Sequence, residues 1–355
     1  MAQINKPTEY FNTKLYTGNA STQSITGINF QSDMVWTKAR SGTYGTQDHA
    51  IIDVVRGVTK TIRPNQTTAE GTETNTITSF DTDGYTIGGD NGKFNQSSTE
   101  YVSWNWLADN TSGASNTDGS ITSTVSANTT SGFSIVKYTG NNSDSTIGHG
   151  LGQKPDFIMI KELDSSSYDW VCYHKALGAS SAIALNLTDN SYAATGWNNG
   201  TEPTSTVFSV DSAANSVNKS GSGFIAYCFA EKKGFSKFGK LQAIGENSNV
   251  FVYTGFKPAF VIIKSLVSDT WSNWYMFDNK RDPDNLTELA LYSNLTTSED
   301  GYGGSNYSQI DMLSNGFKIR RDGNWGVGGA AQSSIYIAFA EQPLVGTNNT
   351  PATAR

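Results

Sequence analysis

The sequence is short of charge. Only 16% of its 355 residues are Asp, Glu, Lys or Arg, against about 25% in a typical soluble domain. Coiled coils and long helical bundles need Ala, Glu, Lys, Leu and Arg in quantity, so this composition excludes them. The net charge is −7, whereas a nucleic-acid binder would carry a basic stripe. We therefore expect no nucleic-acid partner, and few residues from which a catalytic or metal site could be built.

Cysteine and long apolar runs are also scarce. The two cysteines, Cys172 and Cys228, are too few for a disulfide framework, and we interpret them as buried thiols with no bridge required for stability. No apolar run approaches the ~18 residues of a membrane-spanning helix, so no membrane insertion is expected. The N-terminus lacks the hydrophobic segment of a secretory signal. These features predict a protein that is made in a cytoplasm.

Aromatic and turn-forming residues, by contrast, are abundant. Eight Trp, 16 Tyr and 17 Phe accompany 35 Gly. The aromatic side chains supply apolar area for a core, which excludes disorder throughout the chain. A polar, turn-rich chain that also carries many aromatic residues is typical of all-β sandwiches and barrels.

Three sequence markers recur along the chain in the same order. The first is a segment in which Phe precedes Gly by seven residues, the second is a strand that ends in lysine, and the third is a mostly apolar strand. The first marker occupies residues 11–18, 133–140 and 238–245. The second occupies residues 33–38, 156–161 and 259–264. The third occupies residues 101–106, 224–229 and 334–339. Because three markers agree in order and in approximate spacing, the chain is predicted to contain three homologous units.

The markers divide the chain into units and connecting segments. Residues 1–109 form the first unit, 110–132 a linker rich in Ser, Thr, Asn and Gly, 133–231 the second unit, 232–342 the third unit, and 343–355 a C-terminal tail. Part of the linker, Ile121–Val125, could add an edge strand. Each unit has room for roughly six to eight short strands, so the predicted fold is three tandem β-sandwich units of the jelly-roll kind.

Two local patterns add detail to this prediction. The lysines that end the second marker, Lys38, Lys161 and Lys264, are interpreted as strand-end residues that face water. The glycines that precede two later strands, Gly84 and Gly316, are interpreted as turn residues with a positive φ.

The motifs in the sequence fall short of a recognisable chemistry. Residues 234–240 match most of a phosphate-binding loop, but Leu241 stands where the magnesium-binding Ser or Thr should be. The three histidines, His49, His149 and His174, form no cluster with zinc-ligand spacing. No G-x-S-x-G motif occurs, and no pairing of a nucleophile with a base recurs between units. We therefore expect no enzymatic activity, no catalytic residue, no metal and no cofactor.

Two units share an acid–arginine pair at the same position. Asp53 and Arg56 in the first unit correspond to Asp278 and Arg281 in the third, while the second unit has His174 in place of the acid. Such a pair could contact a ligand. The alternative is an ion pair that fixes a loop, which arginine and carboxylate groups form routinely.

Four tryptophans are candidates for a different kind of site. Trp170, Trp197, Trp271 and Trp274 are of the type that jelly-roll faces present to sugars, and they suggest a lectin-like protein. The alternative for each of them is packing in the core.

Several longer segments are specific enough to compare with known families. They are Tyr10–Asn19, Asp118–Thr130, Ala226–Glu231, Gly234–Gly239 and Pro351–Arg355. Together they resemble a family of phage proteins that is widespread in phages of marine and freshwater bacteria, cyanobacteria included, and that carries a domain of unknown function. The resemblance covers nearly the whole chain and supplies no catalytic residues.

This resemblance implies a structural protein on the surface of a virion, of the kind often labelled tail-fibre-like. We expect a head-decoration protein or a short tail fibre or spike, with other virion proteins as partners and a homotrimer as the assembly. A lectin-like adhesin that recognises host surface glycans is the alternative. An enzyme that degrades capsular polysaccharide is a further alternative, for which two carboxylates would have to meet in one cleft.

Overall fold

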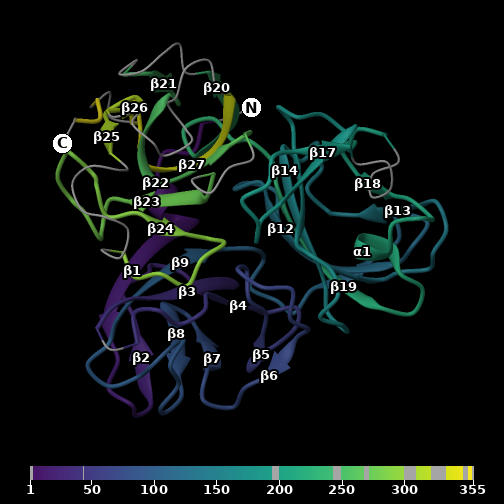
Figure 1. Ribbon diagram of the computed structural model, residues 1–355, viewed down its shortest axis with the longest axis horizontal. Helices are drawn as coiled ribbons and strands as arrows, with labels where there is room; N and C mark the ends of the chain where they lie inside the picture. Colours follow the sequence, from purple (N-terminus) through teal and green to yellow (C-terminus); the bar gives the residue numbers. More distant parts are fainter. Residues whose placement is uncertain are drawn as a thin grey trace.

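The protein, seen here as a computed structural model, consists almost entirely of β-strands and loops (Figure 1). The structure describes residues 3–42, 44–193, 200–242, 249–267, 272–299, 309–320, 333–346 and 351–353. Within these ranges the helical elements are one 3-10 turn, η1 (Pro7–Glu9), and one short α-helix, α1 (Asn215–Asn218). The all-β fold predicted from the composition is confirmed.

The first unit contains a larger and a smaller antiparallel sheet. The larger sheet consists, in order, of β1 (Phe11–Thr17), β9 (Glu100–Trp106), β3 (Met34–Ser41) and β4 (Ala50–Asp53). The smaller sheet consists of β2 (Gln23–Ile25), β8 (Gly84–Ile87) and β7 (Ile77–Asp81), and a separate pair is formed by β5 (Lys60–Thr61) and β6 (Gly71–Thr72). Apolar side chains such as Val35, Ile52 and Tyr85 fill the space between the two sheets.

The second unit repeats this arrangement with a wider sheet. Its eight strands are, in order, β10 (Ala114–Asn116), β11 (Ser123–Asn128), β12 (Phe133–Thr139), β19 (Gly223–Phe229), β14 (Phe157–Glu162), β15 (Val171–His174), β16 (Ser181–Ala184) and β17 (Tyr192–Ala193). A two-stranded sheet, β13 (Ser145–Gly148) and β18 (Val207–Val210), covers one face of it through Ile147 and Phe208.

The segment 110–132 was expected to be a linker with at most an edge strand. Instead it contributes two strands, β10 and β11, to that wide sheet. β11 pairs with β12 over five residues, from Thr124 opposite Lys137 to Asn128 opposite Phe133, and β10 pairs with β11. Thr, one of the residues that suggested a flexible linker, is also enriched in strands that have one face covered. Val125 supplies that covered face, because it lies in the core of the second unit.

The third unit again has a larger and a smaller sheet. The larger consists, in order, of β20 (Ser236–Gln242), β27 (Ser333–Pro343), β22 (Phe256–Ser265), β23 (Trp274–Asp278) and β24 (Leu291–Tyr292). The smaller consists of β21 (Phe251–Tyr253), β26 (Gly316–Ile319) and β25 (Ile310–Leu313). Val252 and Phe317 of the smaller sheet pack with Val261 and Phe277 of the larger one.

The three sequence markers occupy equivalent strands of the three larger sheets. In each sheet the strand of the third marker lies between the strands of the first and second markers. The register differs in one place. Phe11 pairs with Trp106 and Phe133 pairs with Phe229, but it is Ser236, not Phe238, that pairs with Phe339. The first marker is therefore displaced by two residues in the third unit, which keeps Phe238 on the same face of its strand.

The second faces of the three larger sheets meet in one shared core. Trp106, Phe229 and Phe339 come from β9, β19 and β27, and their ring centroids form a closed triangle with sides of 6.2, 5.8 and 5.6 Å. Figure 1 shows the first unit (purple to blue), the second (teal) and the third (green to yellow) around this common centre. The core cluster that contains the triangle draws residues from all three units, so the units bury their apolar surface against one another.

The two glycines interpreted as turn residues differ in their reason for being glycine. Gly84 has a φ of 130°, as predicted. Gly316 does not have a positive φ, so that prediction was wrong for it. A Cβ at Gly316 would collide with the carbonyl oxygen of Val252, and one at Gly84 would collide with that of Ile25. Close approach of the neighbouring strand is therefore what the two positions share.

Candidate functional site

Both predicted acid–arginine pairs form, and both are fully buried. Arg56 Nε donates to Asp53 Oδ2 over 2.6 Å, and Arg281 Nε donates to Asp278 Oδ2 over the same distance. Each guanidinium also donates to two backbone carbonyl oxygens of its own unit. Such pairs hold the loop after β4 or β23 in place. The loop-fixing interpretation therefore describes their geometry, and neither acid is open to a ligand.

Each of these positions also reaches into a neighbouring unit. Tyr227 of the second unit donates its hydroxyl to Asp53 over 2.7 Å, and Trp104 of the first unit donates its indole N–H to Asp278 over 3.1 Å. At the equivalent position of the second unit, His174 Nε2 lies 3.2 Å from the carbonyl oxygen of Tyr336 in the third unit. The contacts run from first to second, second to third and third to first. They form a ring of three joints.

The histidine replaces the acid in its local role as well. His174 Nδ1 accepts the backbone N–H of Ala176 over 3.1 Å, just as Asp53 accepts that of Val55. With Nδ1 as acceptor and Nε2 as donor, the imidazole is neutral. Burial lowers the pKa of His174 to about 4, against the smaller raising effect of its bond to Tyr336. The joint between the second and third units is thus held without a charge.

The tryptophan candidates that the structure describes are part of the same ring. Trp170 and Trp274 are fully buried. Trp170 donates its indole N–H to the carbonyl oxygen of Arg63 in the first unit, and Trp274 donates to that of Ala184 in the second, both over 2.9 Å. The prediction that they could present a face to a sugar was wrong, because their rings lie in the shared core. Trp197 and Trp271 lie outside the described residues.

The prediction that Lys38, Lys161 and Lys264 face water was also wrong, because all three are fully buried. Each donates to the carbonyl oxygen of the next residue and to another carbonyl seven or eight residues on. The acceptors are Ala39 and Gly45 for Lys38, Glu162 and Tyr168 for Lys161, and Ser265 and Ser272 for Lys264. Burial lowers the pKa of Lys38 to about 7 and that of Lys161 to about 8. The recurrent lysine ties down the loop that follows its strand.

An asparagine that recurs in the three units was not predicted to have a structural role. The side-chain oxygens of Asn65, Asn186 and Asn294 accept the backbone N–H groups of His49, Trp170 and Trp274, over 3.0–3.1 Å. Each of these asparagines begins an Asn-x-Thr triplet, at residues 65–67, 186–188 and 294–296. The triplets look like glycosylation sites. Their equivalent positions in the three units were the signal that they serve the fold.

The two cysteines are free and buried. Cys172 lies in the core shared by the three units, whereas Cys228 lies in the core inside the second unit. They therefore belong to opposite faces of one sheet, and burial raises the pKa of both thiols. The interpretation as buried thiols is confirmed. Among the described residues there is no group of three or more His, Cys, Asp and Glu side chains that could hold a metal ion.

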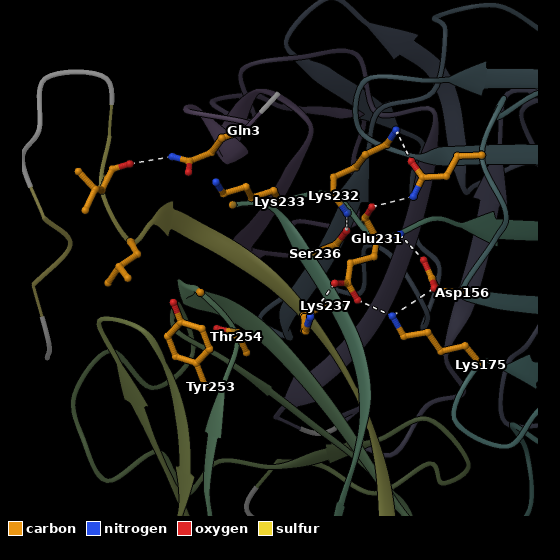
Figure 2. Close-up of a pocket in the computed structure, with 15 residues that line it drawn as sticks. Gln3, Asp156, Lys175, Glu231, Lys232, Lys233, Ser236, Lys237, Tyr253 and Thr254 are labelled. Carbon is orange, nitrogen blue, oxygen red and sulfur yellow. Dashed lines mark hydrogen bonds and ion pairs between the residues drawn. The ribbon is translucent and has the colours of Figure 1, made fainter. Parts of the chain in front are cut away.

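A cleft of about 550 Å³ opens at the place where the second and third units meet the N-terminal segment (Figure 2). Its lining combines charged, amide and apolar side chains. The residues are Gln3, Gln153, Asp156, Lys175, Glu231, Lys232, Lys233, Gly234, Ser236, Lys237, Tyr253, Thr254, Gly255, Leu344 and Val345. The N-terminal segment is fixed at the rim, since Ile4 N donates to Lys233 O and Gln3 Nε2 donates to Val345 O.

Part of the charge in the cleft is matched internally. Lys175 Nζ lies 2.6 Å from Glu231 and 3.2 Å from Asp156, and Lys237 Nζ lies 2.7 Å from the other oxygen of Glu231. Burial opposes charge on Lys175 and on Glu231. Their mutual contacts outweigh it, so the pKa of Lys175 is raised and that of Glu231 is lowered. Within this network Lys175 and Glu231 stay ionised.

Two further lysines of the cleft are not matched in this way. Lys232 Nζ donates to the neutral Gln153 Oε1 over 3.0 Å, and burial lowers the pKa of Lys232. Lys233 is exposed, and within the described part of the chain it forms no ion pair. Tyr253 lies on the other side of the cleft in Figure 2, with 57% of its surface exposed. The cleft therefore offers excess positive charge beside an open aromatic ring.

Fold and cleft together define an all-β protein with a closed ring of three units and one polar cleft at a joint. The chain belongs to the family described as a domain of unknown function, DUF7483, whose model matches residues 6–343. The match takes in all three units together. No curated protein matches the chain.

One solved structure with weak similarity is that of the conserved protein of unknown function PA5104 from Pseudomonas aeruginosa PAO1. The similarity covers 63% of this chain and 84% of that chain, with 8% identity and a TM-score of 0.15. That score is too low to support a conclusion about this protein. No helix among the described residues is long and apolar enough to cross a membrane.

Proposed function

We propose that the protein is a structural component of a bacteriophage particle, exposed on the virion surface as a head-decoration protein or as a short tail fibre or spike. The observation that carries this proposal is the ring of three joints, in which each unit is bound to both neighbours through buried polar contacts. A protein of a phage particle has to stay folded outside the cell, where it is not replaced. A chain in which every unit is bound to both of its neighbours meets this requirement.

The ring also bears on the partners, which we propose to be other virion proteins. A surface with approximate threefold symmetry can meet a threefold partner through three similar contacts. Because one chain already closes the ring, the predicted homotrimer would have to use the outer faces of the units.

An enzymatic role is the weaker alternative, although two carboxylates do meet in one cleft. Asp156 and Glu231 both contact Lys175 there. A glycosidase needs one carboxyl group with a raised pKa that can donate a proton. The pKa of Glu231 is lowered by its two lysine contacts, which is the wrong direction for a general acid. Glu231 is therefore unsuited to act as the general acid, and we expect incubation with capsular polysaccharide to release no reducing ends.

Particles of a phage that encodes the chain test the main proposal. We expect mass spectrometry to detect the protein in particles purified through a density gradient, and immunogold labelling to mark the particle surface. Particles from a phage with the gene deleted are the control. A protein that stays in the soluble fraction of the lysate and is absent from purified particles would contradict the proposal.

A lectin-like adhesin is the second candidate function, and one observation favours it. Tyr253 presents an exposed ring beside a cleft lined with polar groups, and an open aromatic ring is the usual platform for a sugar. The two candidates are compatible, because an adhesin can itself be part of a particle.

A further inference from the structure

The cleft breaks the repeat of the three units. Residues 231–233 are Glu-Lys-Lys, whereas the equivalent residues are Ala-Asp-Asn at 108–110 and Glu-Gln-Pro at 341–343. The residues that hold the ring recur from unit to unit, as the buried lysines and asparagines do. The lysine pair, by contrast, occurs at one joint alone, where it lines the cleft.

The charged side chains at the joint between the second and third units favour the binding of an anion. Lys175 pairs with both Glu231 and Asp156, and Lys237 pairs with Glu231, so each of these four groups has a partner of opposite charge. Lys232 has a neutral amide as its partner, and its ammonium is partly withdrawn from water. An anionic group that enters the cleft would gain a charge-assisted contact with Lys232 without having to displace an acid from it. Lys233 stands next along the chain and is exposed to the same ligand.

The aromatic residue on the opposite side of the cleft favours a ligand with a flat or cyclic apolar face. Tyr253 lines the cleft, and Phe251, two residues away on β21, leaves the same face of the strand outside the lining. They are 57% and 45% exposed, among the most exposed large apolar side chains in the described part of the chain. A sugar ring has an apolar face that packs on such aromatic rings and hydroxyl groups that suit the amides of Gln3 and Gln153.

We propose that this cleft binds an acidic saccharide, with a sugar ring on Tyr253 and the carboxylate at Lys232 and Lys233. The volume of about 550 Å³ falls within the range of roughly 300–1,000 Å³ that is usual for small-ligand sites. This proposal rests on the second candidate function, the lectin-like adhesin. It does not depend on whether the protein is part of a virion.

Calorimetric titration of the full chain tests the proposal with two acidic probes, the trisaccharide of galacturonic acid and 3′-sialyllactose. Their neutral counterparts are the methyl-esterified trisaccharide and lactose. We expect at least one acidic probe to bind at least tenfold more tightly than its counterpart, and the affinity to fall as salt rises. Lys232→Gln combined with Lys233→Gln should reduce the affinity for the acidic probe to that of the neutral one.

Variants of the aromatic wall complete the test. Tyr253→Ala should weaken binding of the acidic probe by tenfold or more, while Tyr253→Phe should keep most of it. Tyr192→Ala is the matched control, because Tyr192 is 43% exposed and does not line the cleft. Failure of both acidic probes to bind, equal binding of acidic and neutral probes, or unchanged binding by Tyr253→Ala would each overturn the proposal. None of these results alters what is found in purified particles.

Discussion

Two joints of the ring are held by a buried charge pair, and the third is held by a neutral histidine. Between the first and second units Tyr227 donates to Asp53, and between the third and first units Trp104 donates to Asp278. Between the second and third units the contact is from His174 to a backbone carbonyl. The cleft lies between these same two units. The acid–arginine pair is therefore kept at two joints of the ring and replaced by a histidine at the joint that carries the cleft.

This difference teaches what the repeated residues do. An acid with its arginine is costly to bury unless each group is fully engaged, and the described contacts engage both pairs on all sides. The neutral joint needs no such arrangement. In the cleft beside it, Lys232 has a neutral amide and no acid as its partner.

Removal of an acid at a charged joint should have the largest effect. Asp278→Ala leaves the buried Arg281 with only the more distant carboxylate of Glu299, 3.5 Å away, and Trp104 without an acceptor. We expect the free energy of unfolding to fall by about 3–5 kcal/mol, measured by urea denaturation. Glu9→Ala, which removes an exposed surface pair, is the control and should leave it nearly unchanged. A small loss for Asp278→Ala would mean that the buried pair does not hold the joint.

The neutral joint should respond to acid. The pKa of His174 is lowered to about 4 in the folded protein, against about 6.5 for an unfolded histidine. The unfolded chain therefore binds more protons between these values, so stability falls as the pH drops through this range. The histidine accounts for a loss of about 3 kcal/mol over the full range, at about 1.4 kcal/mol for each pH unit.

The comparison of the wild type with His174→Asn isolates this effect, because His49 and His149 titrate in both proteins. Urea denaturation at several pH values from 7 to 4 should show a shallower decline for the variant. Parallel curves for the two proteins would show that the joint is not sensitive to acid.

Loss of a single hydroxyl at a charged joint should have the smallest effect. Tyr227→Phe keeps the ring and removes one hydrogen bond to Asp53. We expect a loss of about 1.5–3 kcal/mol, the usual contribution of a hydrogen bond to a charged group. Tyr192→Phe, at an exposed site, is the matched control. A loss equal to that of Asp53→Ala, which removes the acid of the same joint, would show that the tyrosine, and not the ion pair, dominates the joint.

The sequence was informative where the signal is local or periodic. The three markers were sufficient to predict strands that recur in the same order in each unit, and these strands lie in the three larger sheets. The markers could not show that the larger sheets meet in one core, because packing between units leaves no periodic trace. This is why Trp170 and Trp274 were taken for candidate surface residues.

The remaining misses have physical reasons of a different kind. Lysine at a strand end normally reaches water, and only the loop carbonyls around Lys161 explain why it does not. The cleft brings together residues 3, 153–156, 175, 231–237 and 253–255. Side chains so far apart along the chain can be placed together only by the ring itself, so a single sequence gave no sign of their proximity.

The aromatic triangle has a consequence for how the protein folds during its synthesis. Its three corners lie at positions 106, 229 and 339 of a chain of 355 residues. During synthesis the core cannot close until residue 339 has left the ribosome. Until then the sheets of the first and second units each expose a face of large aromatic rings, and neither can complete its burial alone. Nascent chains should therefore depend on chaperones until the third unit has emerged, and truncations that remove this unit should aggregate.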